Sequence, residues 1–373
     1  MKYYIIAGEA SGDLHGSNLI KELHKIDNNA AIQCWGGDKM EAAGATLVKH
    51  YRDLAFMGFT EVVKNLPTIF RNIAFCKKDI TEFKPDVLVL IDYPGFNLRI
   101  AKWAKQEGFK IIYYISPQVW AWKENRVKAI KRDVDKMLVI LPFEKDFYKK
   151  WDFDVEYVGH PLVEVIDDFR KNDPDNAIYD NVNDIIALLP GSRKQEILVK
   201  LPIMLEVARQ FPHYKFIVAK APGLPSEFYD ELLKPYDNVG AVVNKTYNLL
   251  NAAKAALVTS GTATLETALF AVPEVICYKG GNISYQIAKR LIKIKFIGLV
   301  NLIMDKEVVK ELIQDDLTVN NISIELKKLL EDTARQKILQ QDYRTLKDLL
   351  GKGGHASANA AKNIYDFLKR SFQ

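Results

Sequence analysis

Short apolar runs alternate with helix-compatible stretches along most of the chain, and this alternation constrains the fold more than any other feature. Amphipathic segments such as Ser17–Ile26 and Asn97–Gln106 separate the runs in the first half. Strands that alternate with helices predict a parallel sheet covered by helices. The runs that we expect to form strands there are Tyr3–Ala7, Val87–Ile91, Ile111–Ile115 and Met137–Leu141.

The same pattern restarts in the second half, after a stretch at residues 167–184 where Asp, Asn and Pro dominate and apolar periodicity lapses. We therefore expect an α/β protein with two Rossmann-like parallel-sheet domains, residues 1–166 and 185–350, facing across a cleft and joined by a linker at 167–184. A helical tail at 351–373 is expected to pack back on the first domain. The strands expected in the second domain are Ile185–Leu189, Phe216–Ala219, Ala241–Val243, Ala256–Thr259 and Val275–Tyr278.

Composition narrows the possible functions. The net charge of +5 is small for 373 residues and is spread along the chain, so nucleic-acid binding has little support. The three cysteines are far apart, the six histidines are scattered, and D-x-D matches are about as frequent as chance predicts, so we expect no disulfide, no metal and no cofactor. No stretch approaches the roughly 18 apolar residues of a membrane span, and the first strand does not resemble a secretory signal. A cytoplasmic protein with peripheral membrane contact at most is expected.

Two glycine turns in the second half follow predicted strands and open predicted helices, which suits them to phosphate. In the first, Gly191 permits close approach, and Arg193 beside Ser192 can pair with phosphate oxygens. A plain strand–turn–helix junction is the alternative. The second turn is Ser260–Glu266, whose candidate ligand-binding residues are Ser260, Gly261, Thr262, Thr264 and Glu266, the last for a ribose. Its alternative is a capping box with Thr262 as the N-cap.

In the first half, a carboxylate and another glycine turn follow predicted strands. Asp92 ends the strand Val87–Ile91 and could deprotonate a sugar hydroxyl, although it could also cap the helix that follows Pro94. The turn after the first strand lacks the spacing of the dinucleotide-binding fingerprint. It is either a ligand turn or a tight turn capped by Ser11 or Asp13. Its candidate residues are Gly8, Glu9, Ser11, Gly12 and Asp13.

Two further segments have candidate contacts with a sugar or a lipid. Ser116, Trp120 and Trp122 end another predicted strand, where the indoles could form a wall against a sugar ring or acyl chain or could pack at the domain rim. The tract Phe56–Ile73 has apolar residues near helical spacing with lysines and arginine nearby, which fits a core-facing helix or a membrane-surface helix. Its docking candidates are Val62, Val63, Leu66, Ile69 and Phe70.

Taken together, these motifs resemble the lipid-A-disaccharide synthase family of Gram-negative bacteria over nearly the whole chain. The similarity lies in the order and spacing of six segments. These are Ala7–Asp13, Ile91–Asn97, Tyr114–Trp122, Val158-Gly159-His160-Pro161, Leu189–Arg193 and Ser260–Glu266. The chain departs from the family at Gln118, where the family has Ser, and at Val300, where the family more usually has Pro. Both departures leave local contacts open.

The resemblance implies a GT-B fold and an inverting hexosyltransferase. The reaction would join UDP-2,3-diacylglucosamine to 2,3-diacylglucosamine 1-phosphate through a β-1,6 linkage, with release of UDP and without a metal or cofactor. It implies Asp92 as the base and adds Asn301 to the donor site. Both substrates are acylated, so we expect peripheral association with the cytoplasmic face of the inner membrane. The helical tail could also pack on a second subunit, which leaves a homodimer open. A UDP-sugar 2-epimerase of the same fold is the alternative enzyme, and a nucleotide-binding or membrane-surface protein without activity is the other alternative.

Overall fold

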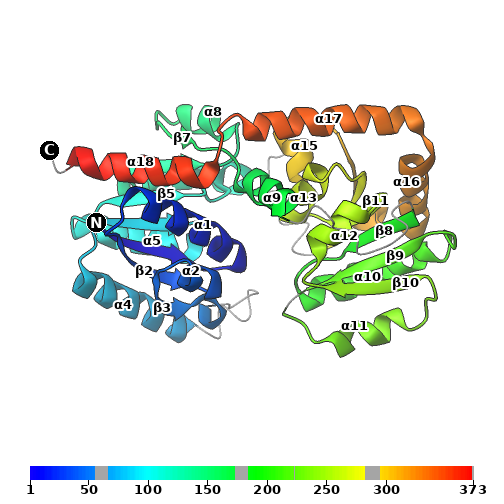
Figure 1. Cartoon of the computed structure of the whole chain (residues 1–373), viewed down its shortest axis with the longest axis horizontal. Coiled ribbons are helices and arrows are strands. Elements are labelled where there is room, and N and C mark those ends of the chain that lie inside the picture. Colours follow the sequence, from blue (N-terminus) through cyan, green and yellow to red (C-terminus); the bar gives the residue numbers. More distant parts are fainter. Residues whose placement is uncertain (55–65, 173–183, 222, 282–294, 372–373) are drawn as a thin grey trace. The chain divides into compact units, whose positions relative to one another are not determined.

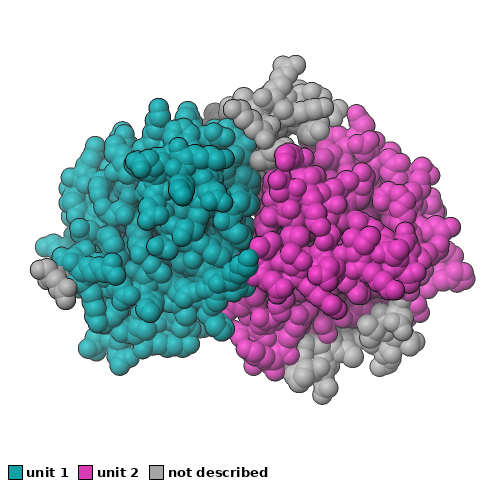
Figure 2. All heavy atoms as spheres, turned by 90° about the horizontal axis from the view of Figure 1, so that it is seen from above, with its two compact units in different colours: residues 1–161, 350–373 teal, residues 162–349 magenta. Residues whose placement is uncertain are grey.

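The computed structural model describes residues 1–54, 66–172, 184–221, 223–281 and 295–371 (Figure 1). The chain forms two compact units, which Figure 2 shows in teal and magenta. Unit 1 contains Met1–Pro161 and Leu350–Gln373, and unit 2 contains Leu162–Leu349. Each unit has its own parallel sheet flanked by helices, so the α/β prediction is confirmed.

The described part of unit 1 has a seven-stranded sheet in the order β3-β2-β1-β4-β5-β6-β7. Its strands are β1 (Lys2–Ala7), β2 (Ala31–Gly36), β3 (Thr46–His50), β4 (Val87–Ile91), β5 (Ile111–Tyr114), β6 (Lys136–Val139) and β7 (Glu156–Tyr157). Its helices include α1 (Ala10–Ile26), α2 (Asp38–Ala42), α4 (Leu66–Phe83), α5 (Pro94–Gln106), α6 (Val119–Trp122), α7 (Val127–Asp133), α8 (Glu144–Lys149) and α18 (Ala356–Ser371). The chain order reverses between β1 and β4, and such a reversal is where open α/β sheets bind ligands.

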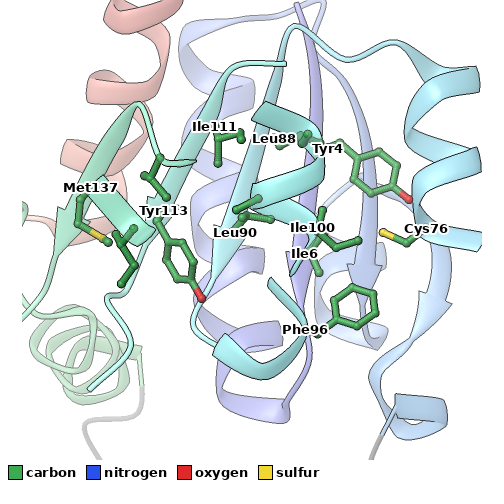
Figure 3. Packing of buried hydrophobic residues seen from close by; sticks show 14 of the residues in the cluster. Tyr4, Ile6, Cys76, Leu88, Leu90, Phe96, Ile100, Ile111, Tyr113 and Met137 are labelled. Atoms are coloured by element: carbon green, nitrogen blue, oxygen red, sulfur yellow. The ribbon is translucent and has the colours of Figure 1, made fainter. Parts of the chain in front are cut away.

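The central strands of unit 1 are buried on both faces because their side chains alternate between two cores. Tyr4 and Ile6 of β1 pack with Leu88 and Leu90 of β4 on one face, where α4 contributes Cys76 and α5 contributes Phe96 and Ile100 (Figure 3). The intervening residues Tyr3 and Ile5 pack on the other face with α1 and α18. This arrangement explains why β1 and β4 are continuous apolar runs.

The last helix, α18, belongs to unit 1 although the chain reaches it only after unit 2. It lies against α1 and contributes Ala360, Ile364 and Leu368 to the core shared with β1. The chain that leads to it crosses unit 1 at a contact between Gly159 and Gly353. A Cβ added to Gly353 would lie 2.3 Å from the backbone N of Gly159, so this crossing has no room for a side chain.

Unit 2 has a six-stranded sheet in its described part, in the order β10-β9-β8-β11-β12-β13. The strands are β8 (Ile185–Leu189), β9 (Lys215–Lys220), β10 (Val239–Val243), β11 (Ala255–Thr259), β12 (Glu274–Tyr278) and β13 (Lys310–Ile313). Helices include α9 (Pro161–Asn172), α10 (Lys194–Ala208), α11 (Ser226–Leu233), α12 (Thr246–Ala252), α13 (Thr262–Leu269), α15 (Leu299–Met304), α16 (Val319–Glu331) and α17 (Thr333–Gly351). Here the chain order reverses between β8 and β11.

The stretch expected as a linker begins with helix instead. Residues 167–172 are the second half of α9, and 173–183 lie outside the described residues. Apolar contacts continue there, since the Phe169 ring lies 5.4 Å from the Tyr247 ring and 5.9 Å from the Phe270 ring, centre to centre. The described part of this segment, residues 167–172, is therefore helical, whereas the sequence pattern indicated an irregular linker.

The residues predicted to dock on a membrane differ in their exposure, and some of them are not described. Val62 and Val63 lie outside the described residues, as does the side chain of Leu66, the first residue of α4. Ile69 is partly buried against the unit 1 core, whereas the side chain of Phe70 is 59% exposed, and docking by either residue stays a prediction. In the described part of the chain, no helix combines the length and apolar character needed to cross a bilayer.

Candidate functional site

Both predicted glycine turns of unit 2 line one cavity of about 440 Å³. They follow β8 and β11, the neighbouring strands between which the chain order reverses, so parallel pairing brings their carboxyl ends together. Gly191 and Gly261 have φ of 117° and 145°, a region that favours glycine. A Cβ on Gly191 would also lie 2.7 Å from the Glu196 carboxylate. The sequence pattern identified each turn separately, and the pairing of β8 with β11 brings the two together.

Two helices begin at the cavity wall. Arg193 is the N-cap of α10 and Gly261 is the N-cap of α13, and neither N-cap makes a side-chain capping hydrogen bond. The first backbone N–H groups of a helix have no partner inside the helix, and they attract anions. Gly191, Ser192, Arg193, Gly261 and Thr262 all line the cavity. This wall suits a phosphate or diphosphate, and the capping box that was the alternative for Thr262 is not formed.

Three charged side chains near this wall interact with one another. Arg193 donates to the Glu196 carboxylate at 3.3 Å, and the Lys200 ammonium lies 3.7 Å from the other oxygen of that carboxylate. Lys200 also donates to the Thr259 hydroxyl, and its side chain is only 3% exposed. Burial lowers the pKa of Lys200, and Glu196 opposes that shift. Sequence reasoning missed Glu196 and Lys200, although their spacing from Arg193 on one helix face was a usable signal.

Glu266 also lines the cavity and is held by Tyr247, whose hydroxyl donates to its carboxylate at 2.8 Å. Burial raises the pKa of Glu266, and the hydrogen bond from Tyr247 lowers it. A positioned carboxylate beside an anion site can accept hydrogen bonds from the hydroxyls of a sugar. The cavity lining thus contains anion-binding groups together with one hydroxyl-binding group.

Three predicted donor-site residues have structural contacts. Ser260 lines the cavity, but its hydroxyl donates to the Ile297 carbonyl at 3.1 Å. Thr264 is buried, and its hydroxyl donates to the Gly261 carbonyl at 2.8 Å. Asn301 is fully buried and its amide makes four hydrogen bonds, to Val309, Glu311 and the backbone N–H groups of residues 308 and 309. The polar atoms of Asn301 and Thr264 thus hold the backbone around the donor cavity, and their contact with a ligand stays a prediction.

In unit 1, Asp92 stands at the carboxyl end of β4, beside β1 at the reversal of strand order. Asp92 and Tyr93 have φ of 43° and 48°, which is strained for residues with side chains. Asn97 donates to the Asp92 carbonyl at 2.8 Å and Tyr113 donates to it at 2.5 Å, and these bonds stabilise the turn. Tyr93 is the N-cap of α5, so the alternative in which Asp92 caps that helix is not formed.

Burial raises the pKa of Asp92 to about 6, and the nearby Glu9 carboxylate adds to the shift. Glu9 belongs to the glycine turn after β1, which therefore lies close to Asp92. The two motifs also fit each other, since a Cβ on Gly8 would lie 2.3 Å from the Tyr93 ring. A carboxylate with such a pKa is mostly ionised at pH 7 yet more basic than an ordinary aspartate.

The predicted site residues of the glycine turn after β1 differ in burial. Glu9 and Ser11 are exposed, and Gly12 packs against Ala7 of β1. Asp13 is 3% exposed and accepts hydrogen bonds from the backbone N–H groups of Gly37, Lys39 and Met40. Its carboxylate holds the start of α2, and a role at the acceptor site stays a prediction.

The predicted site residues that follow β5 also differ in their exposure. Ser116 and Trp120 are buried, and Ser116 hydrogen-bonds the Tyr148 hydroxyl at 2.6 Å. Burial raises the pKa of Glu144 to about 7, and Ser116 and Trp120 oppose that shift. A ligand wall at this segment stays a prediction, and Trp122 is 49% exposed.

The remaining motif, Val158–Pro161, contains a buried histidine that no assigned role uses. His160 lies near His15 of α1, and burial lowers their pKa values to about 3 and about 4 respectively. Both rings are therefore neutral at physiological pH. Gly159 of this motif makes the close crossing with Gly353.

The chain is similar to known proteins over nearly its whole length. The family model described as lipid-A-disaccharide synthetase matches residues 3–365. A lipid-A-disaccharide synthase of Geobacter metallireducens is 39% identical over 357 residues, which cover 94% of this chain and 93% of that protein.

Solved structures share the fold at low identity. The glycosyltransferase of kitacinnamycin has a TM-score of 0.69 at 15% identity, covering 98% of this chain and 99% of the other. A UDP-GlcNAc 2-epimerase from Neisseria meningitidis, solved with UDP-GlcNAc, has a TM-score of 0.68 at 13% identity, covering 99% and 100%. Glycosyltransferases and epimerases therefore share this GT-B architecture, and the fold does not separate them. The sequence match does separate them: over nearly its whole length, the chain belongs to the lipid-A-disaccharide synthase family of glycosyltransferases.

Proposed function

We propose that this protein transfers the 2,3-diacylglucosaminyl group of a UDP donor to the 6-hydroxyl of 2,3-diacylglucosamine 1-phosphate. The products are UDP and a β-1,6-linked disaccharide 1-phosphate. The observation that carries the proposal is the unit 2 cavity, where two glycine turns, two helix N-termini and Arg193 converge. Membership of the family supplies the substrates.

The donor diphosphate would occupy this cavity. As the glycosidic bond breaks, the leaving diphosphate gains negative charge, which the backbone N–H groups beside Ser192 and Gly261 can stabilise without rearranging. Arg193 would move from Glu196 to the phosphate oxygens or bridge the two. Glu266 would accept hydrogen bonds from ribose hydroxyls. In this scheme the fixed donors and the guanidinium take the place of a metal ion.

Asp92 would act as the general base on the acceptor. Its carboxylate would take the proton of the 6-hydroxyl while that oxygen attacks the anomeric carbon from the face opposite UDP, so the configuration inverts. The pKa of about 6 supports this role, because burial makes the carboxylate a stronger base while leaving it ionised at neutral pH.

The direct test is whether UDP release depends on the acceptor. Purified protein is incubated with UDP-2,3-diacylglucosamine, with and without 2,3-diacylglucosamine 1-phosphate, and UDP and the lipid products are quantified. We expect UDP release only with the acceptor, in equal amount to the disaccharide. UDP release or formation of a 2-epimeric sugar without acceptor would instead support the epimerase that shares the fold. UDP binding without any turnover would support a nucleotide-binding protein.

Acylated substrates imply work at a bilayer surface, and we propose that α4 provides the contact. Phe70 and Phe75 are exposed on this helix, and Arg71 and Lys78 beside them are exposed cations that suit anionic headgroups. Phe70→Glu should reduce flotation with anionic vesicles, measured against Ile338→Glu, which changes an equally exposed residue of unit 2. Equal flotation of both variants would remove α4 from this role.

The homodimer stays a prediction, to be checked by analytical ultracentrifugation.

A further inference from the structure

Two cations share one exposed indole just after α6. The Lys123 Nζ atom lies 3.9 Å from the centre of the Trp122 ring, and the Arg126 guanidinium carbon lies 5.8 Å from it. Trp122 is 49% exposed, while Lys123 and Arg126 are each half-buried. The face of an indole attracts cations, so this arrangement holds both positive groups in place.

These two cations lack a counter-charge among the described residues. No ion pair within 4 Å joins either of them to a carboxylate there, and Glu124 between them is exposed. Burial lowers the pKa of Lys123, and repulsion from Arg126 lowers it further. Two like charges held together without an anion destabilise each other, and a bound anion would relieve that repulsion.

The cations lie on the same edge of the unit 1 sheet as Asp92. Tyr114, the last residue of β5, pairs with Ile91 of β4, and the segment to Arg126 continues from that strand end. Tyr113 links the two places, because its hydroxyl donates to the Asp92 carbonyl and also lies within electrostatic reach of Arg126. An acceptor whose hydroxyl reaches Asp92 therefore has this cationic pair nearby.

We propose that Lys123 and Arg126, held over the face of Trp122, bind the phosphate monoester of the acceptor sugar. This subsite rests on the proposed function, in which the acceptor has a 1-phosphate group. A guanidinium can bind two phosphate oxygens at once, and the ammonium adds a point charge. The pair would thus select the phosphorylated acceptor and orient its far end.

The test measures binding without turnover. A short-chain 2,3-diacylglucosamine 1-phosphate and its dephosphorylated counterpart are titrated by calorimetry into wild-type protein and into the double variant Lys123→Gln/Arg126→Gln. We expect wild type to prefer the phosphorylated ligand by about tenfold to a hundredfold, the usual range for charge-assisted hydrogen bonds. The preference should shrink to about threefold or less in the double variant. An unchanged preference would overturn the proposal.

Two controls distinguish recognition of the sugar phosphate from a general effect of charge or a general loss of binding. Lys128→Gln removes an exposed cation from α7, the next helix, and should keep the wild-type preference. UDP binding should be the same in all variants, because its proposed site lies in unit 2. If Lys128→Gln loses the preference as well, general charge attraction explains it and the subsite is wrong.

An anionic lipid headgroup offers the same phosphate chemistry, so a vesicle arm is needed. Flotation with phosphatidylglycerol vesicles should be the same for wild type and the double variant. If the double variant loses flotation but keeps its preference for the phosphorylated sugar, the pair serves the bilayer and the proposal fails. Absence of acceptor-dependent UDP release by wild type would overturn the proposed function alone, because the titration decides the subsite without donor.

Discussion

The two places where strand order reverses lie at the carboxyl edges of similar sheets, yet their charged groups differ. In unit 2, Arg193 and Lys200 flank Glu196, and two helix N-termini add partial positive charge. In unit 1, Asp92 is buried near a second carboxylate, Glu9. The shared topology therefore fixes where ligands bind, while the side chains decide whether the site attracts an anion or keeps a base.

The two sites differ in how far their role depends on the protonation state of a side chain. Unit 2 presents groups that are ready for negative charge and need no change of protonation. Unit 1 keeps a carboxylate in a strained turn, where desolvation makes it basic. Variants in one unit should therefore alter donor binding, and variants in the other should alter turnover.

The largest effect is expected for Asp92→Asn. Loss of a general base typically costs about 10²- to 10⁴-fold in rate, so we expect kcat to fall on the order of 10³-fold. UDP affinity, measured by calorimetry, should stay within about twofold, because donor binding belongs to unit 2. Asp146→Asn changes an exposed carboxylate of unit 1 and should leave both values unchanged. Normal turnover in Asp92→Asn would contradict the assignment.

Arg193→Met should produce the next largest effect. Removing a guanidinium that binds phosphate costs about tenfold to a hundredfold in affinity for UDP. Circular dichroism should be unchanged, since the side chain is exposed at the cavity wall. Arg209→Met, at another exposed arginine of unit 2, is the matched control. Equal UDP affinity in both variants would place the diphosphate elsewhere.

Lys200→Met tests whether the buried ammonium supports the anion site from behind. Without it, Glu196 has only Arg193 as a cationic partner among the described residues, so Arg193 is less free to bind phosphate. We expect UDP affinity to fall about fivefold, on the scale of one partly screened charge. Lys200→Arg should recover part of that loss, and Lys234→Met at an exposed site should show none. A drop in thermal stability with unchanged UDP affinity would limit Lys200 to a structural role.

The smallest effect concerns pH. Because Asp92 has a raised pKa of about 6, kcat/KM should fall as the pH drops through that value and the base becomes protonated. Glu9 raises the pKa of Asp92 by repulsion, so Glu9→Gln should lower it and move the acid limb to lower pH by a fraction of a unit. Normalised pH profiles of the two proteins measure this shift. A limb that moves to higher pH would show that Glu9 acts on Asp92 in some other way.

Much of the architecture was predictable because the central strands of both sheets are buried on two faces and form apolar runs. The strands β2, β3, β7 and β13 were missed. β3, β7 and β13 are edge strands with polar or half-buried side chains, and β2 includes Gln33 and a terminal glycine. Period alone does not distinguish such segments from loops. The fold class could therefore be predicted from the central strands of each sheet, whereas the number of strands could not.

The site was predictable to the extent that backbone turns define it. Gly191 and Gly261 come two residues after predicted strands, so the parallel-sheet rule places both turns at one sheet edge, and the pairing of β8 with β11 brings them together. Asn301 and Asp13 belong to equally suggestive motifs, but motif position does not reveal whether a side chain points to a ligand or to the backbone. The contact of Lys200 with Thr259 joins residues 59 positions apart, and it depends on how α10 packs beside β11. Such contacts come from tertiary packing, which a single sequence does not specify.

The return of α18 to unit 1 has a consequence for how the chain is made. During synthesis, residues 1–161 emerge first, but one face of their sheet lacks Ala360, Ile364 and Leu368 until translation is nearly finished. Unit 2, encoded later, has all of its strands available earlier than unit 1 has all of its core. A ribosome stalled near residue 350 would therefore hold an incomplete first domain with an apolar face open to chaperones.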